Sequence, residues 1–296
     1  MVEAELWLFV LISSLSYMTP ILLATIGEII TERSGIVNVG IEGILLSSAF
    51  ASVATSFFSG SMLLGVLAGT LAGALLGALF GLFAVYLRAD QIIAGLAINM
   101  ASYGFTVLGL IAIWGHHGAS PRVEGQLPYF SIGQSTVPLL TLLAILIAVL
   151  SWFFLFRTRT GLALRACGEE PRAADAMGVN TYRYRIAATT LGGTLAGLGG
   201  AFLALEIAGV FTRGMSAGMG FIALANVAFS GWNPLPAVFG AYVFGFLSAA
   251  ADALQQEVGY AYLLKTLPYL GTLAITVLTA RRSRAPLRLG VPYARE

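Results

Sequence analysis

Residues 62–87 read MLLGVLAGTLAGALLGALFGLFAVYL, and this run contains no charged side chain. At 1.5 Å of rise per residue, a helix of this length reaches about 39 Å, which exceeds the roughly 30 Å thickness of the hydrocarbon core of a bilayer. Glycine recurs at every fourth position, which places five glycines on nearly one helix face. They are Gly65, Gly69, Gly73, Gly77 and Gly81. We therefore expect a transmembrane helix whose glycine face packs closely against another backbone.

The composition extends this expectation to the rest of the chain. Of 296 residues, 58% are hydrophobic and only 10% are charged, and the mean hydropathy is +0.86. A soluble domain carries about 25% charged residues because its surface faces water. The chain is therefore predicted to be an integral membrane protein embedded in the lipid bilayer. A soluble enzyme, a nucleic-acid binder and a disordered scaffold are excluded.

Nine apolar segments divide the chain into expected membrane spans. They lie near 6–26, 36–58, 62–87, 91–114, 137–156, 186–208, 215–230, 235–252 and 259–280. This pattern predicts an all-α, polytopic fold with about nine transmembrane helices in a single domain over residues 1–296. The seventh segment is short and is flanked by Gly218, Gly231 and Pro234, which favours a broken or a re-entrant helix. A re-entrant segment would change the parity of the count.

The basic residues predict the orientation of the chain. Eleven of the 16 Lys and Arg residues fall within 157–185 and 281–295, and basic loops of membrane proteins remain in the cytoplasm. Nine spans place both segments on one side, so we expect a cytoplasmic C-terminus and an external N-terminus in the cell membrane. No Lys or Arg precedes the first apolar run, which is therefore predicted to be a retained span rather than a secretory signal. Cys167, the only cysteine, is predicted to be a reduced and inert thiol.

The sequence lacks the motifs of a catalytic or metal-binding protein. It contains no Gly-x-x-x-x-Gly-Lys-Ser/Thr phosphate loop, no His-Glu-x-x-His motif and no Cys/His cluster. His116 and His117 are adjacent in an expected outer loop, where solvated side chains are the simpler interpretation. We therefore expect no catalytic residue, no metal site and no cofactor.

The basic loop 157–185 contains a predicted short helix within the stretch RACGEEPRAADAMGVN at 165–180. Proline suits a first helical turn, acidic side chains suit the positive end of the helix dipole, and glycine suits the position after a helix end. A helix of about 12 Å is too short to be stable alone in water, so a groove on a partner is expected to hold it, although an ordinary basic inner loop explains the same residues. The predicted helix comprises Glu169, Glu170, Pro171, Arg172, Ala173, Ala174, Asp175, Ala176, Met177 and Gly178.

Four stretches of the chain together resemble the permease subunits of ATP-binding-cassette importers for sugars, nucleosides and branched-chain amino acids. They are GEIITERSGIVNVGIEG at 27–43, RADQIIAGLAIN at 88–99, the loop stretch at 165–180 and GFIALA at 220–225. The resemblance covers nearly the whole chain. The first stretch is similar to the nucleoside and simple-sugar branch of these permeases rather than to the amino-acid branch.

This resemblance implies a transport subunit rather than an enzyme. It implies that the short helix of 169–178 is a coupling helix that docks on a separate ATPase and moves the adjacent spans when the ATPase dimer closes. It also implies a second permease subunit, identical or homologous, and an external substrate-binding protein. The expected function is inward transport of a nucleoside, with a ribose-type sugar as the alternative. A secondary transporter driven by an ion gradient would also use broken helices, but it would have no need of a coupling helix.

Polar side chains at membrane depth are the candidates for the translocation pathway, because insertion of a charged group costs roughly 2.5 to 3.5 kcal/mol. Asn38 and Glu42 have the i, i+4 spacing that would place them on one face of the second span. Asn99 and Asn226 are similar candidates. For each of them the alternative is a structural role, either capping a broken helix or bonding to a neighbouring span.

Overall fold

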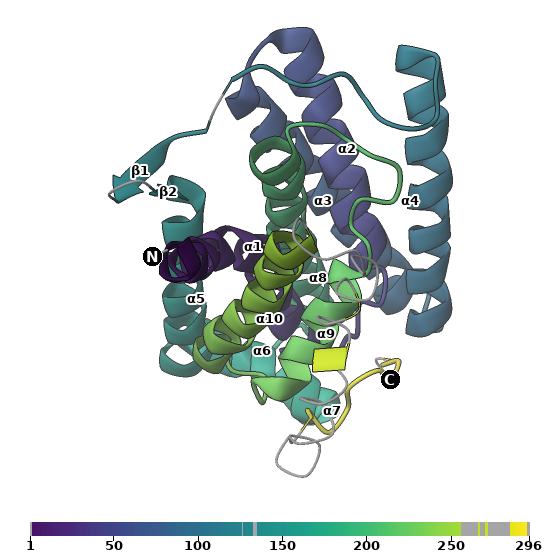
Figure 1. Ribbon diagram of the computed structural model, residues 1–296. Coiled ribbons are helices and arrows are strands. Elements are labelled where there is room, and N and C mark those ends of the chain that lie inside the picture. The colour runs from purple at the N-terminus through teal and green to yellow at the C-terminus, as the bar shows by residue number, and fades with distance from the viewer. Residues whose placement is uncertain are drawn as a thin grey trace.

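The computed structural model describes residues 2–125, 127–132, 135–255, 266, 270–271 and 285–294. These residues form a helical bundle with one small β-hairpin (Figure 1). The helices are α1 (Val2–Arg33), α2 (Ile41–Ser59), α3 (Met62–Gly81) with its π-helical extension η1 (Leu82–Tyr86), α4 (Gln91–Trp114), α5 (Leu139–Arg157), α6 (Arg159–Glu169), α7 (Pro171–Ala176), α8 (Thr181–Phe202) with its π-helical extension η2 (Leu203–Ala208), α9 (Met219–Phe229) and α10 (Pro234–Gln255). The antiparallel strands are β1 (Tyr129–Ile132) and β2 (Ser135–Pro138).

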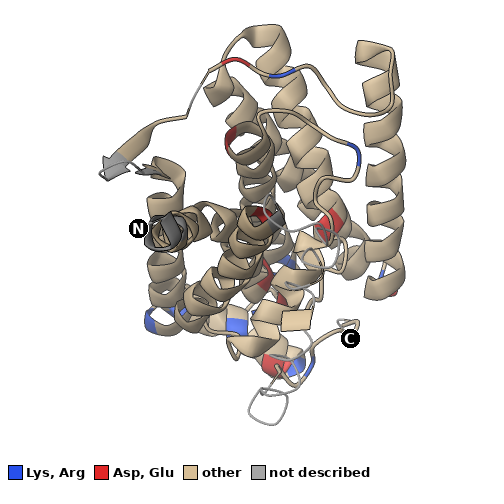
Figure 2. Ribbon diagram, in the orientation of Figure 1, with Lys and Arg blue, Asp and Glu red and all other residues tan. Residues whose placement is uncertain are grey.

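The prediction of an all-α polytopic membrane protein is confirmed. Within the described residues, seven helices are long and apolar enough to cross a bilayer: α1, α2, α3 with η1, α4, α5, α8 with η2, and α10. Charged residues gather on α6, α7 and the C-terminal segment 285–294, whereas α3, α4 and α5 carry few (Figure 2). The last expected span, 259–280, lies outside the described residues apart from three positions.

The helices divide into a buried centre and an exposed periphery. In α1, α2 and α8, 61% to 67% of the most apolar window is buried, whereas in α3, α4 and α5 the share is 22% to 28%. The peripheral helices expose large apolar side chains such as Leu71 and Leu75 of α3. An apolar exterior of this kind is suited to lipid, because hydrocarbon tails are as apolar as leucine.

Glycines allow the backbones of α3 and α8 to approach closely. A methyl group added at Gly73 would lie 2.3 Å from the carbonyl oxygen of Gly193 and 2.5 Å from Cα of Gly197, both in α8. Gly77 would meet α8 in the same way, and Gly81 would meet the Thr189 hydroxyl. Gly65 and Gly69 instead adjoin Ser56 and Ser52 of α2, so the glycine face of α3 follows two neighbours.

The segment around α9 crosses the bundle from one end to the other. Before α9, the backbone N–H of Val123 in the long loop after α4 donates to the carbonyl of Gly209, at the end that carries the β-hairpin. After α9, Arg33 at the end of α1 donates to the carbonyls of Gly231 and Trp232, at the end that carries α6 and α7. The 11 residues of α9 rise only about 16 Å. Of the two forms that the sequence favours, the structure therefore has a broken crossing, made of a run of turns and a short helix, rather than a re-entrant loop.

Candidate functional site

The turn between α1 and α2 is buried and non-helical. The backbone N–H of Asn38 donates a 2.7 Å hydrogen bond to Glu28 of α1, and the Asn38 side-chain oxygen accepts from the backbone N–H of Gly40 at 3.1 Å. Both side chains are buried. Because α2 begins only at Ile41, Asn38 and Glu42 are not one turn apart on a helix face, and the expectation that they share such a face is wrong. The side-chain bonds within the turn replace the helical bonds that would have aligned them.

Two side chains of α4 hold the other side of this turn. The side-chain oxygen of Gln91 accepts from the backbone N–H of Val37 at 2.8 Å. The Asn99 side chain accepts from Gly43 N–H at 2.7 Å and donates to the Val39 carbonyl at 3.0 Å. A backbone group without a partner is costly at membrane depth. These amides therefore stabilise the break between α1 and α2.

Glu42 joins α2 to the first turn of α9. Its two carboxylate oxygens accept from the backbone N–H groups of Gly218 and Gly220, each at 2.7 Å. The N-terminus of a helix carries unsatisfied donors and a partial positive charge, so a carboxylate is well matched to it. A methyl group added at Gly220 would lie 2.6 Å from Cα of Glu42, which leaves space for no residue but glycine. Glu42 is thus an anchor of the broken crossing, and its side chain remains partly exposed.

Asn226 is completely buried between three helices. Its side-chain nitrogen donates to Thr25 Oγ1 of α1 at 3.2 Å and to the Ala237 carbonyl of α10 at 3.0 Å. A methyl group added at Gly240 would lie 1.9 Å from the Asn226 side-chain oxygen. The environment of Asn226 is therefore one of helix packing.

The basic loop folds into two helices instead of the single expected helix. Glu169 ends α6, Glu170 is the N-cap of α7, and Pro171 occupies the first turn of α7. Gly178 follows α7 with φ 85°, a conformation that favours glycine. Of the three alanines in the predicted helix, Ala174 is buried, whereas Ala173 and Ala176 are exposed. Met177 is 85% exposed beside them.

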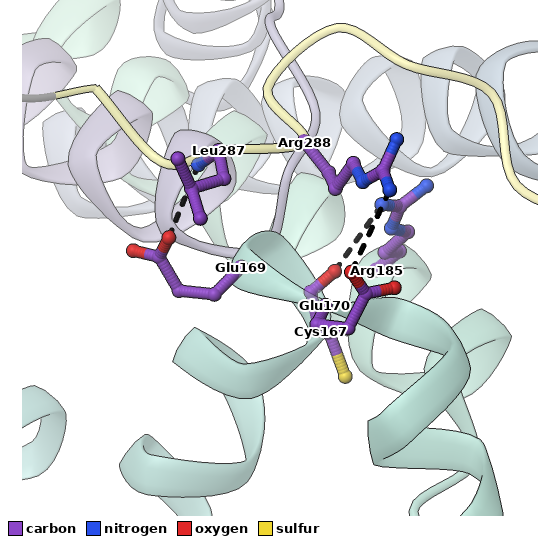
Figure 3. Close-up of polar contacts among 6 residues, drawn as sticks. All are labelled: Cys167, Glu169, Glu170, Arg185, Leu287 and Arg288. Carbon is purple, nitrogen blue, oxygen red and sulfur yellow. Dashed lines mark hydrogen bonds and ion pairs between the residues drawn. The ribbon is translucent and has the colours of Figure 1, made fainter.

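The C-terminal segment 285–294 lies along this loop (Figure 3). The backbone N–H of Leu287 donates to the Glu169 carboxylate at 3.1 Å, and Arg288 forms an ion pair of 3.5 Å with Glu170. The Tyr293 hydroxyl donates to Asp175 of α7 at 2.6 Å. Two stretches of the chain with clustered basic residues therefore lie at the same end of the bundle.

Arg185 connects the loop, the α1–α2 turn and the C-terminal segment. Its guanidinium, 2% exposed, donates to the carbonyls of Ser34 at 3.1 Å, Cys167 at 3.2 Å and Val291 at 3.3 Å. Figure 3 shows the Cys167 contact beside the Arg288 ion pair. A methyl group added at Gly168 would lie 2.4 Å from the Arg33 carbonyl oxygen, so the end of α6 contacts the end of α1 directly. Burial raises the pKa of the Cys167 thiol, which is consistent with an inert thiol.

Comparisons with known proteins connect the chain to membrane transporters. Residues 10–273 match the model of the family described as "Branched-chain amino acid transport system / permease component". The chain belongs to this permease family. It is 36% identical to the nucleoside ABC transporter permease protein NupC of Lactococcus lactis, over 94% of each chain, and 36% identical to the guanosine ABC transporter permease protein NupQ of Bacillus subtilis, over 95% of each chain. A second Lactococcus lactis protein, the nucleoside ABC transporter permease protein NupB, is 23% identical over 82% of this chain and 72% of its own length. No solved structure gives a significant match.

Several buried polar residues of the permease were not singled out in the sequence. Besides Glu28 and Arg185, Glu32 of α1 accepts a hydrogen bond from the Trp232 indole just beyond α9. Glu28, Glu32 and Arg33 all lie in the stretch at 27–43 that carried the family resemblance. The available signal was the presence of three charged residues in the short gap between the expected spans 6–26 and 36–58.

Within the described residues, the permease has no group of three or more His, Cys, Asp or Glu side chains that could hold a metal ion. Its polar side chains instead form hydrogen bonds at the turn between α1 and α2, at the first turn of α9 and at the end of the bundle that carries α6 and α7. Such an arrangement can position helices and transmit movement between them.

Proposed function

We propose that this permease moves a nucleoside, with guanosine as the first candidate, inward across the cell membrane. The observation that carries the proposal is 36% identity, over more than nine tenths of both chains, to permeases named for nucleosides and for guanosine. The permease itself is a transport component, and ATP hydrolysis belongs to a partner ATPase.

The exposed side of α7 is the proposed docking surface for that ATPase. This coupling surface consists of Arg172, Ala173 and Ala176, which are exposed on the six-residue helix, and of Met177, which directly follows it. An exposed methionine between small side chains suits a groove, because its flexible thioether adapts to irregular surfaces. Docking of an ATPase on this surface would place the end of the bundle that carries α6, α7 and the C-terminal segment in the cytoplasm.

The contacts described above give a route from α7 to the transport pathway. Movement of α7 reaches α6, whose Gly168 contacts the end of α1, and Arg185 joins both to the turn that begins α2. Glu42 then connects α2 to the start of α9. A shift of the loop would therefore reposition the broken crossing as a unit. Glu42 and Asn99 border the proposed pathway, whereas Asn38 and Asn226 position its helices from within the protein.

The complete importer is proposed to contain two ATPase subunits, a second permease and an external binding protein. The second permease is proposed to be a non-identical homologue. Two Lactococcus lactis permeases named for nucleosides, both related to this chain, support that arrangement.

Uptake measurements test the proposed function. Labelled guanosine and labelled ribose are supplied to cells with and without this chain, under ATP depletion and under ionophore treatment. We expect guanosine uptake that requires the chain and ATP. Uptake of ribose alone would assign a sugar importer, and uptake that survives ATP depletion but collapses with the ionophore would overturn coupling to an ATPase.

A further inference from the structure

Arg213 is a charged residue that neither the α1–α2 turn nor the coupling surface uses. It lies in the run of turns over 213–218, between η2 and α9, and its side chain is exposed. Its Nε donates a 2.6 Å hydrogen bond to the Tyr103 hydroxyl, and its guanidinium lies 5.2 Å from the centroid of the Tyr103 ring. Tyr103 is midway along the 24 residues of α4. The contact therefore lies well inside the thickness that α4 spans.

The charge of Arg213 has no acidic counterpart in the part of the chain that the structure describes. The Nε–H is used by Tyr103, which leaves the four N–H groups of the two terminal nitrogens available. An exposed guanidinium that faces hydrocarbon is strongly unfavourable, so charged side chains at this depth face a polar cavity or a partner. The exposure of Arg213 thus requires a polar cavity or a partner beside this part of α4.

Polar residues continue from Arg213 and Tyr103 to the anchored start of α9. Tyr103 and Asn99 are one turn apart on α4, and Asn99 bonds to the first turn of α2. The segment that carries Arg213 ends at Gly218, which bonds to Glu42. Within the same segment Ala217 has φ 43°, an uncommon conformation for a residue other than glycine. Arg213, Tyr103 and the partly exposed Glu42 and Asn99 therefore follow one side of the broken crossing.

We infer that Arg213 and Tyr103 form a platform that binds the base of a nucleoside on the pathway. The inference rests on the proposed function and names the contact that recognises the substrate. Bases stack on aromatic rings and on guanidinium planes, and Arg213 over Tyr103 supplies both in one place. The free terminal N–H groups donate to carbonyl oxygens in the plane of the guanidinium. A guanine base, with a carbonyl where adenine has an amino group, is matched to these donors better than adenine.

The test uses the complete importer and compares initial uptake rates of guanosine and adenosine. Arg213→Gln removes the charge and most of the donors, and Arg213→Lys keeps the charge but removes the planar fork. Tyr103→Phe keeps the ring without the hydroxyl, whereas Tyr103→Leu removes the ring. Arg122→Gln is the matched control, because Arg122 is an exposed arginine in the loop after α4 whose side chain lies beside Gly209. Copurification of the second permease reports assembly in each variant.

We expect Arg213→Gln to lower the guanosine rate about tenfold and to narrow the ratio of guanosine to adenosine uptake, which is the loss expected for a hydrogen bond to a charged donor. Arg213→Lys should not restore the ratio of guanosine to adenosine uptake. Tyr103→Phe should retain more uptake than Tyr103→Leu, and Arg122→Gln should match the wild type.

An unchanged guanosine rate in Arg213→Gln would show that the side chain lies off the pathway. An equal loss for both nucleosides would overturn base recognition, and loss of copurification would assign Arg213 to the interface with the second permease. If the wild-type chain imports ribose and not guanosine, the proposed function itself fails.

Discussion

The carboxylate of Glu42 in α2 accepts a 2.7 Å hydrogen bond from the backbone N–H of Gly218, at the start of α9. Glu42 belongs to a helix that follows a buried turn, and Gly218 belongs to a crossing that is helical over only part of its length. Two interrupted elements are therefore joined at their helix N-termini. The bond couples them without a continuous helix between them, so they can move together.

Glu42→Gln should destabilise the protein rather than change substrate handling alone. The glutamine side chain has one oxygen in place of two, so one of the N–H groups of Gly218 and Gly220 loses its acceptor. Hydrogen bonds to charged groups contribute about 1.5 to 3 kcal/mol. We expect a lower thermal midpoint for the purified importer. Glu124→Gln, in the exposed loop after α4, is the control and should leave the midpoint unchanged. A normal midpoint with reduced uptake would instead assign Glu42 to substrate contact.

Gly73→Ala should be among the most disruptive single-methyl changes in the permease. The added methyl group would lie 2.3 Å from the Gly193 carbonyl oxygen, and backbone on both helices leaves no flexible side chain to move aside. Overpacking of this kind costs about 1 to 3 kcal/mol. Gly104→Ala in α4 is the matched control, because a methyl group there meets nothing within 4 Å. Thermal unfolding of the two variants should separate them, and equal midpoints would contradict the close approach of α3 and α8.

The sequence predicted the membrane class and most of the spans because apolar length and charge placement act locally. The turn between α1 and α2 was missed for a different reason. The spacing of Asn38 and Glu42 suggests a helix face, but Gln91 and Asn99 satisfy the turn from a helix more than 50 residues away in the sequence. The role of Arg185 was missed in the same way, since its three carbonyl partners come from three separate segments. Such tertiary bonds leave no periodic pattern in one sequence.

Arg185→Lys should impair folding although it keeps the charge. A lysine ammonium is a point charge and cannot reproduce the planar fork that reaches the carbonyls of Ser34, Cys167 and Val291. Buried carbonyls without a donor cost about 1 to 3 kcal/mol each. We expect a marked loss of folded protein in the membrane. Arg183→Lys, two residues earlier and exposed, should be neutral. Wild-type yield of Arg185→Lys would show that the three contacts contribute little to folding.

The Cys167 thiol should resist alkylation in the folded protein. Burial raises its pKa, so the thiolate fraction at neutral pH is smaller than for an ordinary cysteine, and it increases only as the pH rises. We expect slow maleimide labelling at pH 7, faster labelling at pH 9, and rapid labelling at either pH after denaturation. Rapid labelling of the native protein at pH 7 would show that the end of α6 opens readily.

Gly178→Val should uncouple ATP hydrolysis from transport while leaving the chain inserted. Gly178 has φ 85° and nothing lies within 4 Å of an added methyl group, so the effect of valine arises from the backbone and not from packing. Left-handed backbone costs about 1 to 2 kcal/mol for residues other than glycine, which favours a different end for α7. We expect basal ATPase activity to persist while stimulation by loaded binding protein and nucleoside uptake are both lost. Gly60→Val supplies the control, because Gly60 has φ 66° and equally open surroundings but lies at the other end of the bundle, after α2. The same loss of uptake in Gly60→Val would mean that backbone strain alone, and not the position of α7, explains the loss.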